Sequence, residues 1–164
     1  MINNLFEEMN ICAGFGPVDM ATAANNGDWI SLKNYEGIAI VLFKAAGTAG
    51  DDPVFTLRQA SDVAGTGAKA LNFTTIYEKV GTLTSIGTFT KVTQAAANTY
   101  TNTVSAEAAA IMGVHIRASE LDTQNGFDCV QFQVPDIGAN AQLGAGFYIL
   151  LNPRYAQPLS AIVD

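Results

Sequence analysis

Few residues in this sequence have the type and spacing that catalysis or metal binding requires. His115 is the only histidine, and no Cys or His stands at ligand spacing from it, so neither a zinc site nor a Ser-His-Asp triad has a signature. We expect a surface or interface histidine. Asp51, Asp52 and Asp62 could offer oxygen ligands to calcium, but their spacing matches no known calcium loop. A solvated turn before Pro53 is the simpler interpretation.

Two further patterns mimic chemical motifs. Residues 65–69 (GTGAK) contain the glycines and lysine of a phosphate loop, but one residue separates the glycines and Ala70 replaces the required Ser or Thr. The pattern predicts a glycine-supported hairpin turn. Asp122 and Asp128 could be considered as the two catalytic carboxylates of a glycosidase. They flank the turn at residues 125–126, however, and we expect them to cap this turn. We therefore expect no enzymatic activity, no catalytic residue, no metal and no cofactor.

Aromatic residues offer a different chemistry, since rings can stack against sugars. Aromatic side chains on strands more often fill a core or a subunit interface, so glycan binding is kept only as an alternative. The six residues concerned are Trp29, Tyr35, Tyr77, Tyr100, Tyr148 and Tyr155.

The elements that must position these residues are strands. Strand-like runs alternate with turns rich in Gly, Asp, Asn and Pro. One such turn, residues 25–28 (NNGD), predicts positive φ at Asn26 and Gly27. We expect at most one short helix, over residues 105–112, because this run is rich in alanine. The pattern predicts an all-β fold, an antiparallel β-sandwich or jelly-roll-like single domain. The expected strands are 29–32, 38–43, 54–59, 71–73, 76–80, 88–93, 114–118, 130–134 and 147–151.

The alternation within these runs predicts the core. Apolar residues occupy every second position in three strands, which places them on one buried face. Residues 38–43 are apolar on both faces, which indicates a central strand or one covered by a partner. The alternation of apolar and polar residues is interrupted at residues 74–75, which predicts a β-bulge. The threonine-rich run 88–93 is expected to be an edge strand of a sheet. The predicted core contains Phe55, Leu57, Val114, Ile116, Val130, Phe132 and Val134.

Composition favours an assembly and excludes some partners. Only 14% of the 164 residues are charged and 49% are hydrophobic, against about 25% charged in an ordinary domain. We therefore expect surface that is concealed in an assembly. The net charge of −7 argues against nucleic acid, and the apolar runs are too short to span a bilayer. No basic residue precedes Lys33, so no secretory signal is expected. Cys12 and Cys129 could form a disulfide, but we interpret them as two buried free thiols of a protein made in a reducing cytosol.

Two segments are candidates for contact with other molecules. Residues 1–13 have an apolar stripe with helical i,i+4 spacing, and we interpret them as a docking arm in front of a β-sandwich domain of residues 14–164. A strap that closes its own sandwich is the alternative. Residues 94–105, around Tyr100, are either a long hairpin arm or an ordinary loop. The candidate interaction residues are Leu5, Phe6, Met9, Ile11, Tyr100 and Tyr155.

Several short motifs resemble those of small virion proteins from tailed bacteriophages. They are residues 17–19 (PVD), 26–29 (NGDW), 31–35 (SLKNY), 47–53 (GTAGDDP), 59–71 (QASDVAGTGAKAL) and 152–156 (NPRYA). The resemblance implies a structural role in the virion. Within that role we favour a capsid decoration (cement) protein, synthesised in the host cytoplasm, that binds the outer surface of the major capsid protein shell and stabilises it.

The same resemblance implies self-association, with a homotrimer expected because such proteins often sit on threefold positions of a shell. A component of the phage tail or baseplate, or a host glycan-binding module, is the alternative.

Overall fold

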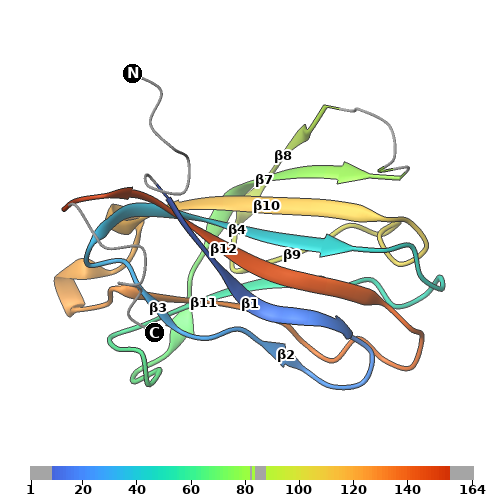
Figure 1. The fold of residues 1–164 in the computed structure, drawn as a ribbon, viewed down its shortest axis with the longest axis horizontal. Coiled ribbons are helices and arrows are strands. Elements are labelled where there is room, and N and C mark those ends of the chain that lie inside the picture. The colour runs from blue at the N-terminus through green and yellow to red at the C-terminus, as the bar shows by residue number, and fades with distance from the viewer. Residues whose placement is uncertain (1–8, 82, 84–87, 156–164) are drawn as a thin grey trace.

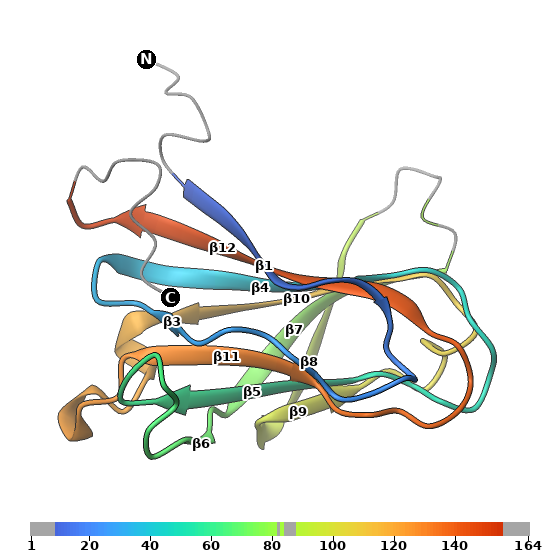
Figure 2. The ribbon, with the colours of Figure 1, turned by 60° about the horizontal axis from the view of Figure 1, so that its bottom comes forward.

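The computed structural model describes residues 9–81, 83 and 88–155. These residues form two antiparallel sheets that stack face to face, as Figure 1 and Figure 2 show. The predicted all-β sandwich is therefore confirmed. The helices of the described part are two three-residue 3-10 turns, η1 (Ala118–Glu120) and η2 (Thr123–Asn125). Neither is long and apolar enough to cross a membrane.

Sheet A has the strand order β1-β12-β4-β10-β7-β8, and its strands β1, β12, β4 and β10 form the upper layer in Figure 2. β4 lies at its centre, where Ile40 pairs with Val114 on one side and with Tyr148 on the other. This confirms a central strand at residues 38–43. The strands are β1 (Met9–Asp19), β12 (Leu143–Pro153), β4 (Tyr35–Lys44), β10 (Ala110–Arg117), β7 (Phe73–Val80) and β8 (Thr90–Ala97).

Sheet B is built around two strands, β11 (Cys129–Val134) and β5 (Val54–Ala60), which pair antiparallel. The short strands β2 (Asn25–Asn26) and β3 (Ile30–Ser31) pair with the free edge of β11. The short strands β6 (Lys69–Ala70) and β9 (Thr99–Thr101) pair with the free edge of β5. Consecutive strands therefore often lie in different sheets, so the chain passes repeatedly from one sheet to the other.

The core lies between the sheets and contains the residues predicted from alternation. Phe55, Leu57, Val114, Ile116, Val130, Phe132 and Val134 are all buried. The Phe132 ring lies at their centre, with its centroid 4.4 Å from that of Phe55 and 5.6 Å from that of Phe15. Period-2 patterning was sufficient to identify this set because each strand places alternate side chains on opposite faces.

Several local predictions are also confirmed. The register of β7 and β8 shifts between Phe73 and Thr75, at the predicted bulge, and β8 is an edge strand. Gly65 and Gly67 have φ of +80° and +66° in the turn that joins β5 to β6. Only glycine adopts such angles at little cost. Cys129 is a buried free thiol, as predicted, whereas Cys12 is only half-buried.

The predicted helix at residues 105–112 is wrong. β10 begins at Ala110, and Ala110 and Met112 pair with Lys44 and Leu42 of β4. Both side chains are buried. Backbone pairing with a central strand and burial of alternate residues override the helix propensity of a few alanines.

The predicted arm over residues 1–13 is corrected in part. β1 begins at Met9 and pairs with β12, starting with Met9 opposite Leu151. Residues 9–13 are therefore strand, not helix, and belong to the sandwich, so the domain boundary at residue 14 falls inside a strand. The edge of β12 offers backbone partners along its whole length, which an isolated helical turn lacks. Leu5 and Phe6 lie outside the described residues.

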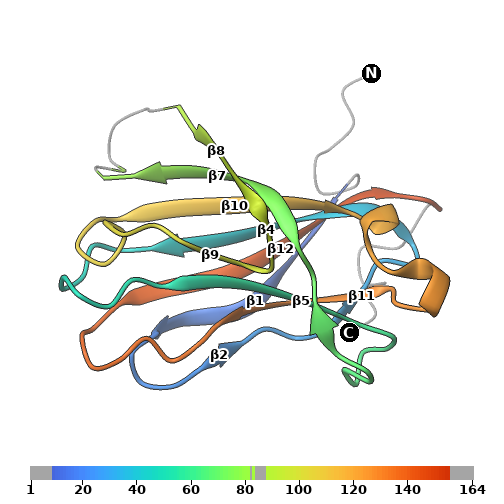
Figure 3. The ribbon, with the colours of Figure 1, turned by 180° about the vertical axis from the view of Figure 1, so that it is seen from behind.

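Residues 94–105 form neither an arm nor a free loop. β8 lies in sheet A and β9 in sheet B, so the chain crosses between the sheets at this point, which Figure 3 shows from behind. Asn98 marks the crossing, and its carbonyl accepts a hydrogen bond of 2.8 Å from the Leu57 amide. The segment therefore closes one side of the sandwich.

Candidate interaction surface

The acidic residues considered for metal binding hold loops together. The Asp52 carboxylate accepts hydrogen bonds from the Ser105 hydroxyl (3.1 Å) and the Ala106 amide (2.8 Å). Asp51 accepts one from the Asn140 amide at 2.8 Å. In the described part of the chain, no three His, Cys, Asp or Glu side chains gather as metal ligands. The carboxylates are therefore engaged in fixing the end of the sandwich.

Asp122 and Asp128 are engaged in the same way. Asp122 pairs with Lys69, whose hydrogen bond lowers the pKa of that carboxyl. Asp128 pairs with Lys33 at 3.1 Å and also accepts a hydrogen bond from the Cys129 thiol. The two carboxylates cap the connection between β10 and β11, and neither stands opposite the other across an open cleft.

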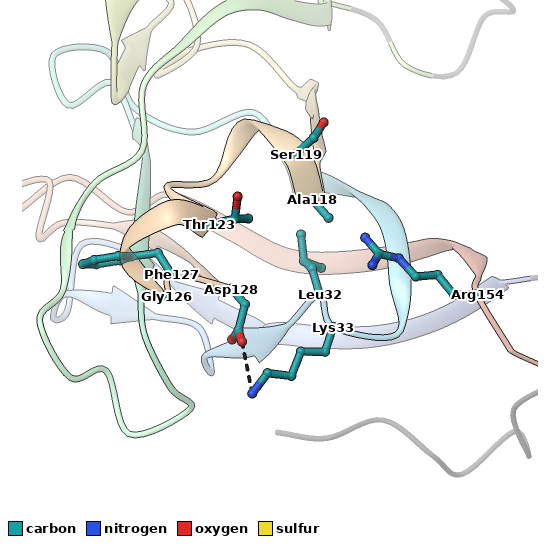
Figure 4. A pocket seen from close by; sticks show the side chains of 9 residues that line it. All are labelled: Leu32, Lys33, Ala118, Ser119, Thr123, Gly126, Phe127, Asp128 and Arg154. Atoms are coloured by element: carbon teal, nitrogen blue, oxygen red, sulfur yellow. Dashed lines mark ion pairs between the residues drawn. The ribbon is translucent and has the colours of Figure 1, made fainter.

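A hollow of about 460 Å³ lies beside this connection (Figure 4). Among the described residues that line it, the one carboxylate is that of Asp128, which Figure 4 shows paired with Lys33. Activation of a hydroxyl such as that of Ser119 or Thr123 requires a base within hydrogen-bond reach, and no lining residue other than Asp128 has a carboxylate or an imidazole. Among the described lining residues, the Ser119 and Thr123 hydroxyls therefore have only the ion-paired Asp128 as a nearby carboxylate. It is lined by Leu32, Lys33, Ala118, Ser119, Thr123, Gly126, Phe127, Asp128 and Arg154.

The surface with the clearest potential for binding is the outer side of sheet A. The inward side chains of β4 fill the core, and the outward ones, Ala39, Val41 and Phe43, are also apolar. The neighbouring strands continue this composition, because Phe147 pairs with Val41 and Ile111 with Phe43. We call this surface the apolar face, and it comprises Ile11, Ala39, Val41, Phe43, Tyr77, Phe89, Ile111, Phe147 and Ile149.

Large side chains of the apolar face are exposed to a degree that is unusual for their type. The exposed fractions are 45% for Ile11, 49% for Phe43, 42% for Tyr77 and 53% for Phe89. A hollow of about 360 Å³ with an apolar lining lies between Tyr77, Phe89 and the strands β4, β10 and β12. The solvent side of an antiparallel sheet is usually polar, and a contiguous apolar patch marks a binding surface.

Among the residues that the structure describes, the charged side chains in the outward rows of sheet A are basic. The outward positions lie in four rows, in register with Gly37, Ala39, Val41 and Phe43 of β4. These rows contain Arg117, His115, Lys91 and Lys79 and no Asp or Glu. The whole chain carries a net charge of −7. The strands that carry the apolar face therefore bear basic side chains in these rows, such as Lys91 on β8, although the chain as a whole is acidic.

The predicted interaction residues are distributed unevenly over this surface. Ile11 belongs to the apolar face, and Met9 lies on the same side of β1, one row away. Tyr155 is 68% exposed beyond the end of β12. Tyr100 has partners in its own chain, since its ring packs on the core and its hydroxyl donates to Glu78 Oε2 at 2.9 Å. Burial first, then that carboxylate, raises the pKa of Tyr100 to about 12.

Four aromatic residues of this surface, Phe43, Tyr77, Phe89 and Phe147, were not predicted as interaction residues. The signal for Phe43 was present, since residues 38–43 are apolar on both faces. The signal for the other three depends on strand order, which brings β12, β4, β10, β7 and the start of β8 together. The six aromatic residues weighed as a glycan platform do not share one surface: Tyr35 and Tyr148 are buried, and Tyr77 belongs to the apolar face.

No family model and no curated protein matches the sequence. Among solved structures, the chain is similar to the crystal structure of the SPBc2 prophage-derived protein YomS, with a TM-score of 0.47 over 87% of this chain and 93% of that chain. The two sequences are 10% identical.

Proposed function

We propose that the protein is a structural component of a tailed-phage particle, of the capsid decoration type. In this proposal it binds the outside of the shell made by the major capsid protein and also binds copies of itself, as a homotrimer. The observation that carries the proposal is the apolar face, a sheet surface suited to a protein partner. The resemblance of the sequence motifs to small virion proteins supports the same role.

The energetics of such a surface favour assembly. Complete burial of a side chain such as Phe43 or Phe89 contributes on the order of 1.5–3 kcal/mol. Repetition over many sites on one particle raises the overall strength of attachment without any new contact. The residues of the apolar face are themselves uncharged, so little charge must be desolvated when they are covered.

Binding, rather than catalysis, is also what the polar side chains support. Asp51, Asp52, Asp122 and Asp128 each hold a loop or an ion pair of the sandwich. His115 is exposed on the outer side of sheet A. Among the described residues that line the hollow of Figure 4, the one carboxylate, Asp128, is held in an ion pair with Lys33. A rigid scaffold with an apolar surface is the arrangement that a cement protein requires.

The proposal is tested with purified protein and phage particles that lack it. Attachment is measured by co-sedimentation, and the position of added protein is determined by cryo-electron microscopy of the intact particle. We expect density on the head surface and loss of attachment or self-association in Phe43→Glu. Val63→Glu is the matched control, because Val63 is 38% exposed in the turn after β5, away from the apolar face. Density on the tail, or no attachment of the unaltered protein, would refute the proposal.

A further inference from the structure

β1 is the terminal strand of sheet A, and its first half leaves an open edge. Within the part of the chain that the structure describes, β1 pairs with β12 and with no other strand. We infer that residues 9–13 pair with the same residues of a second copy, antiparallel and about a twofold axis at Ile11. This inference goes beyond the proposed function, because it rests on the backbone of β1 and requires no phage particle.

The direction of the backbone groups in β12 follows from its pairing with β4. The Ala45 amide donates to the Leu143 carbonyl at 2.8 Å, so every second residue of β12 from Leu143 onward directs its amide and carbonyl toward β4. The register of the two strands is continuous as far as Leu151. The residues in between, which include Tyr148 and Leu150, therefore direct their backbone groups toward β1.

This pattern determines which groups of β1 are left at the open edge. The partners of Tyr148 and Leu150 on β1 are Cys12 and Asn10, whose backbone groups point toward β12. The amides and carbonyls of the alternate residues point away from β12. The open edge therefore presents donors and acceptors that match an antiparallel strand, at Met9, Ile11 and Ala13.

The open stretch lacks the features that usually protect an edge strand. Such strands commonly carry a charged side chain, a proline or a bulge, which discourage pairing with another chain. Residues 9–13 (MNICA) have none of these, and their register with β12 is continuous. The register shifts of β1 and Pro17 lie beyond Ala13.

The other sheet edges of the described chain are protected. β8, at the opposite edge of sheet A, carries Lys91 and has a shifted register with β7. In sheet B, β2 and β3 cover the edge of β11, and β6 and β9 cover that of β5. The first half of β1 is consequently the stretch best suited to receive a further strand.

This stretch is complementary to itself. A twofold axis at Ile11 places Ile11 of one copy opposite Ile11 of the other, and Met9 opposite Ala13. Because all three residues direct their backbone groups outward, each of these pairs can exchange both of its hydrogen bonds. None of the three side chains is charged, so the two edges meet without repulsion between like charges. An isologous twofold contact requires self-complementarity of this kind.

Edge pairing would also extend the apolar face. Ile11 lies on the outer side of sheet A, in register with Ile149 and Ala39, and is 45% exposed. The axis that relates two antiparallel neighbours of one sheet is perpendicular to the sheet, so the outer sides of both copies face the same way. The two apolar faces would form one continuous surface, available to a common partner. In the proposed function, this twofold contact would join copies of neighbouring trimers.

The inference is tested by disulfide formation in Ile11→Cys, in a Cys12→Ser background. The Cα atoms of a hydrogen-bonded antiparallel pair are about 5.5 Å apart, a separation that a disulfide spans. The variant should therefore cross-link to itself. The matched control is Ala95→Cys in the same background, because Ala95 is exposed on β8, the other edge strand of sheet A. Cross-linking is measured for the free protein and for protein added to particles.

A second measurement tests the register with charges at the axis. Met9→Cys in one preparation lies opposite Ala13→Cys in another, so a covalent dimer in the mixture forms between copies. Ile11→Lys in one preparation and Ile11→Glu in the other should support this dimer. Ile11→Lys in both should lower its yield at least about tenfold, because two like charges then meet at the axis.

We expect a covalent dimer of Ile11→Cys and at most a trace of one of Ala95→Cys. Absence of the Ile11→Cys dimer both in solution and on particles would overturn the inference, and it is the result expected if another segment of the chain or a different protein occupies the edge. Equal yields for the two variants would also overturn it, as would a yield that does not depend on the charges at position 11.

The proposed function and this inference fail separately. Protein that attaches to particles without a cross-link at Ile11→Cys would retain the proposed function and lose the inference. Protein that cross-links there but does not attach to particles would do the reverse.

Discussion

The Tyr148 hydroxyl, which belongs to sheet A, accepts a hydrogen bond of 2.9 Å from the backbone amide of Phe132 in sheet B. The same hydroxyl donates to the carbonyl of Asp28 at 3.0 Å. Both sheets and the segment before β3 therefore meet at one phenol. Burial raises the pKa of Tyr148, so the hydroxyl keeps its proton and remains a donor.

Tyr148→Phe should destabilise the fold by about 1–3 kcal/mol, because the Phe132 amide would be left buried without an acceptor. The free energy of unfolding is measured by urea denaturation. Tyr77→Phe is the control, since it removes a phenol hydroxyl from an exposed residue of the apolar face, and it should change stability by less than about 0.5 kcal/mol. Equal effects of the two substitutions would show that the bridging hydroxyl contributes nothing specific.

Gly27→Ala should be destabilising for a related reason. A Cβ at this position would overlap the Tyr148 hydroxyl and would lie 3.0 Å from the carbonyl oxygen of Phe132. Because part of the clash involves the hydroxyl, Tyr148→Phe should relieve some of it. A double-mutant cycle on unfolding free energy should therefore give coupling of about 0.5–3 kcal/mol between the two sites. Additive effects would show that Gly27 is required for another reason.

Gly27 also illustrates where sequence patterns fail. The run NNGD at residues 25–28 predicted a turn with positive φ at Asn26 and Gly27, but neither residue has it, and Asn25–Asn26 form strand β2. Glycine is needed because a side chain from the opposite sheet approaches the backbone. A contact between positions 27 and 148 is non-local, so no window of sequence around Gly27 contains it.

The long strands were predictable because their patterns are local. Phe55 and Leu57 in β5, and Val130 and Phe132 in β11, alternate with polar residues as a half-buried strand requires. The two-sided apolarity of residues 38–43 predicted the central place of β4. Assembly of the apolar face was not predictable, because Phe43, Tyr77 and Phe147 meet only through the order of strands in sheet A.

Phe132→Ala should be among the most destabilising core substitutions. The ring is fully buried and lies between Phe55 and Phe15, in the centre of the core. Truncation of a buried aromatic side chain removes its packing and leaves a cavity, at a cost of roughly 3–5 kcal/mol. Chemical denaturation gives the change in unfolding free energy. A loss below about 1 kcal/mol, the scale of an ordinary substitution, would contradict this place in the core.

The Cys129 thiol should resist alkylation in the folded protein. Burial first, then the hydrogen bond to Asp128, raises its pKa to about 12, so little reactive thiolate exists at about pH 8. Iodoacetamide labelling in a Cys12→Ser background should be slow in buffer and fast in urea. Because the folded pKa exceeds the unfolded one, this group's contribution to stability is complete below about pH 9 and is lost as pH rises toward 12. Rapid labelling of the folded protein would contradict its burial.

The buried charge of Lys44 should lower the unfolding free energy at neutral pH. This cost should become smaller at alkaline pH, where the side chain loses its proton. Its side chain is buried at the end of β4, and its Nζ donates to the carbonyls of Ala45 (2.6 Å) and Ala108 (2.9 Å) as well as to that of Ser105. Burial lowers the pKa of the ammonium, partly opposed by Asp52 and Glu107. Between that lowered pKa and 10.5, the unfolded chain binds more protons than the folded one, so Lys44 makes the unfolding free energy rise with pH.

Lys44→Met isolates this contribution. The substitution should destabilise the protein by about 1–3 kcal/mol, because buried carbonyls lose their donor. Other groups titrate in the same range, so the quantity to measure is the unfolding free energy of the unsubstituted protein minus that of the Lys44→Met variant, at about pH 7, 8.5 and 10. That difference should grow with pH, because only the unsubstituted protein is relieved of a buried charge. A constant difference would mean that the carbonyls compensate fully for the burial of the ammonium.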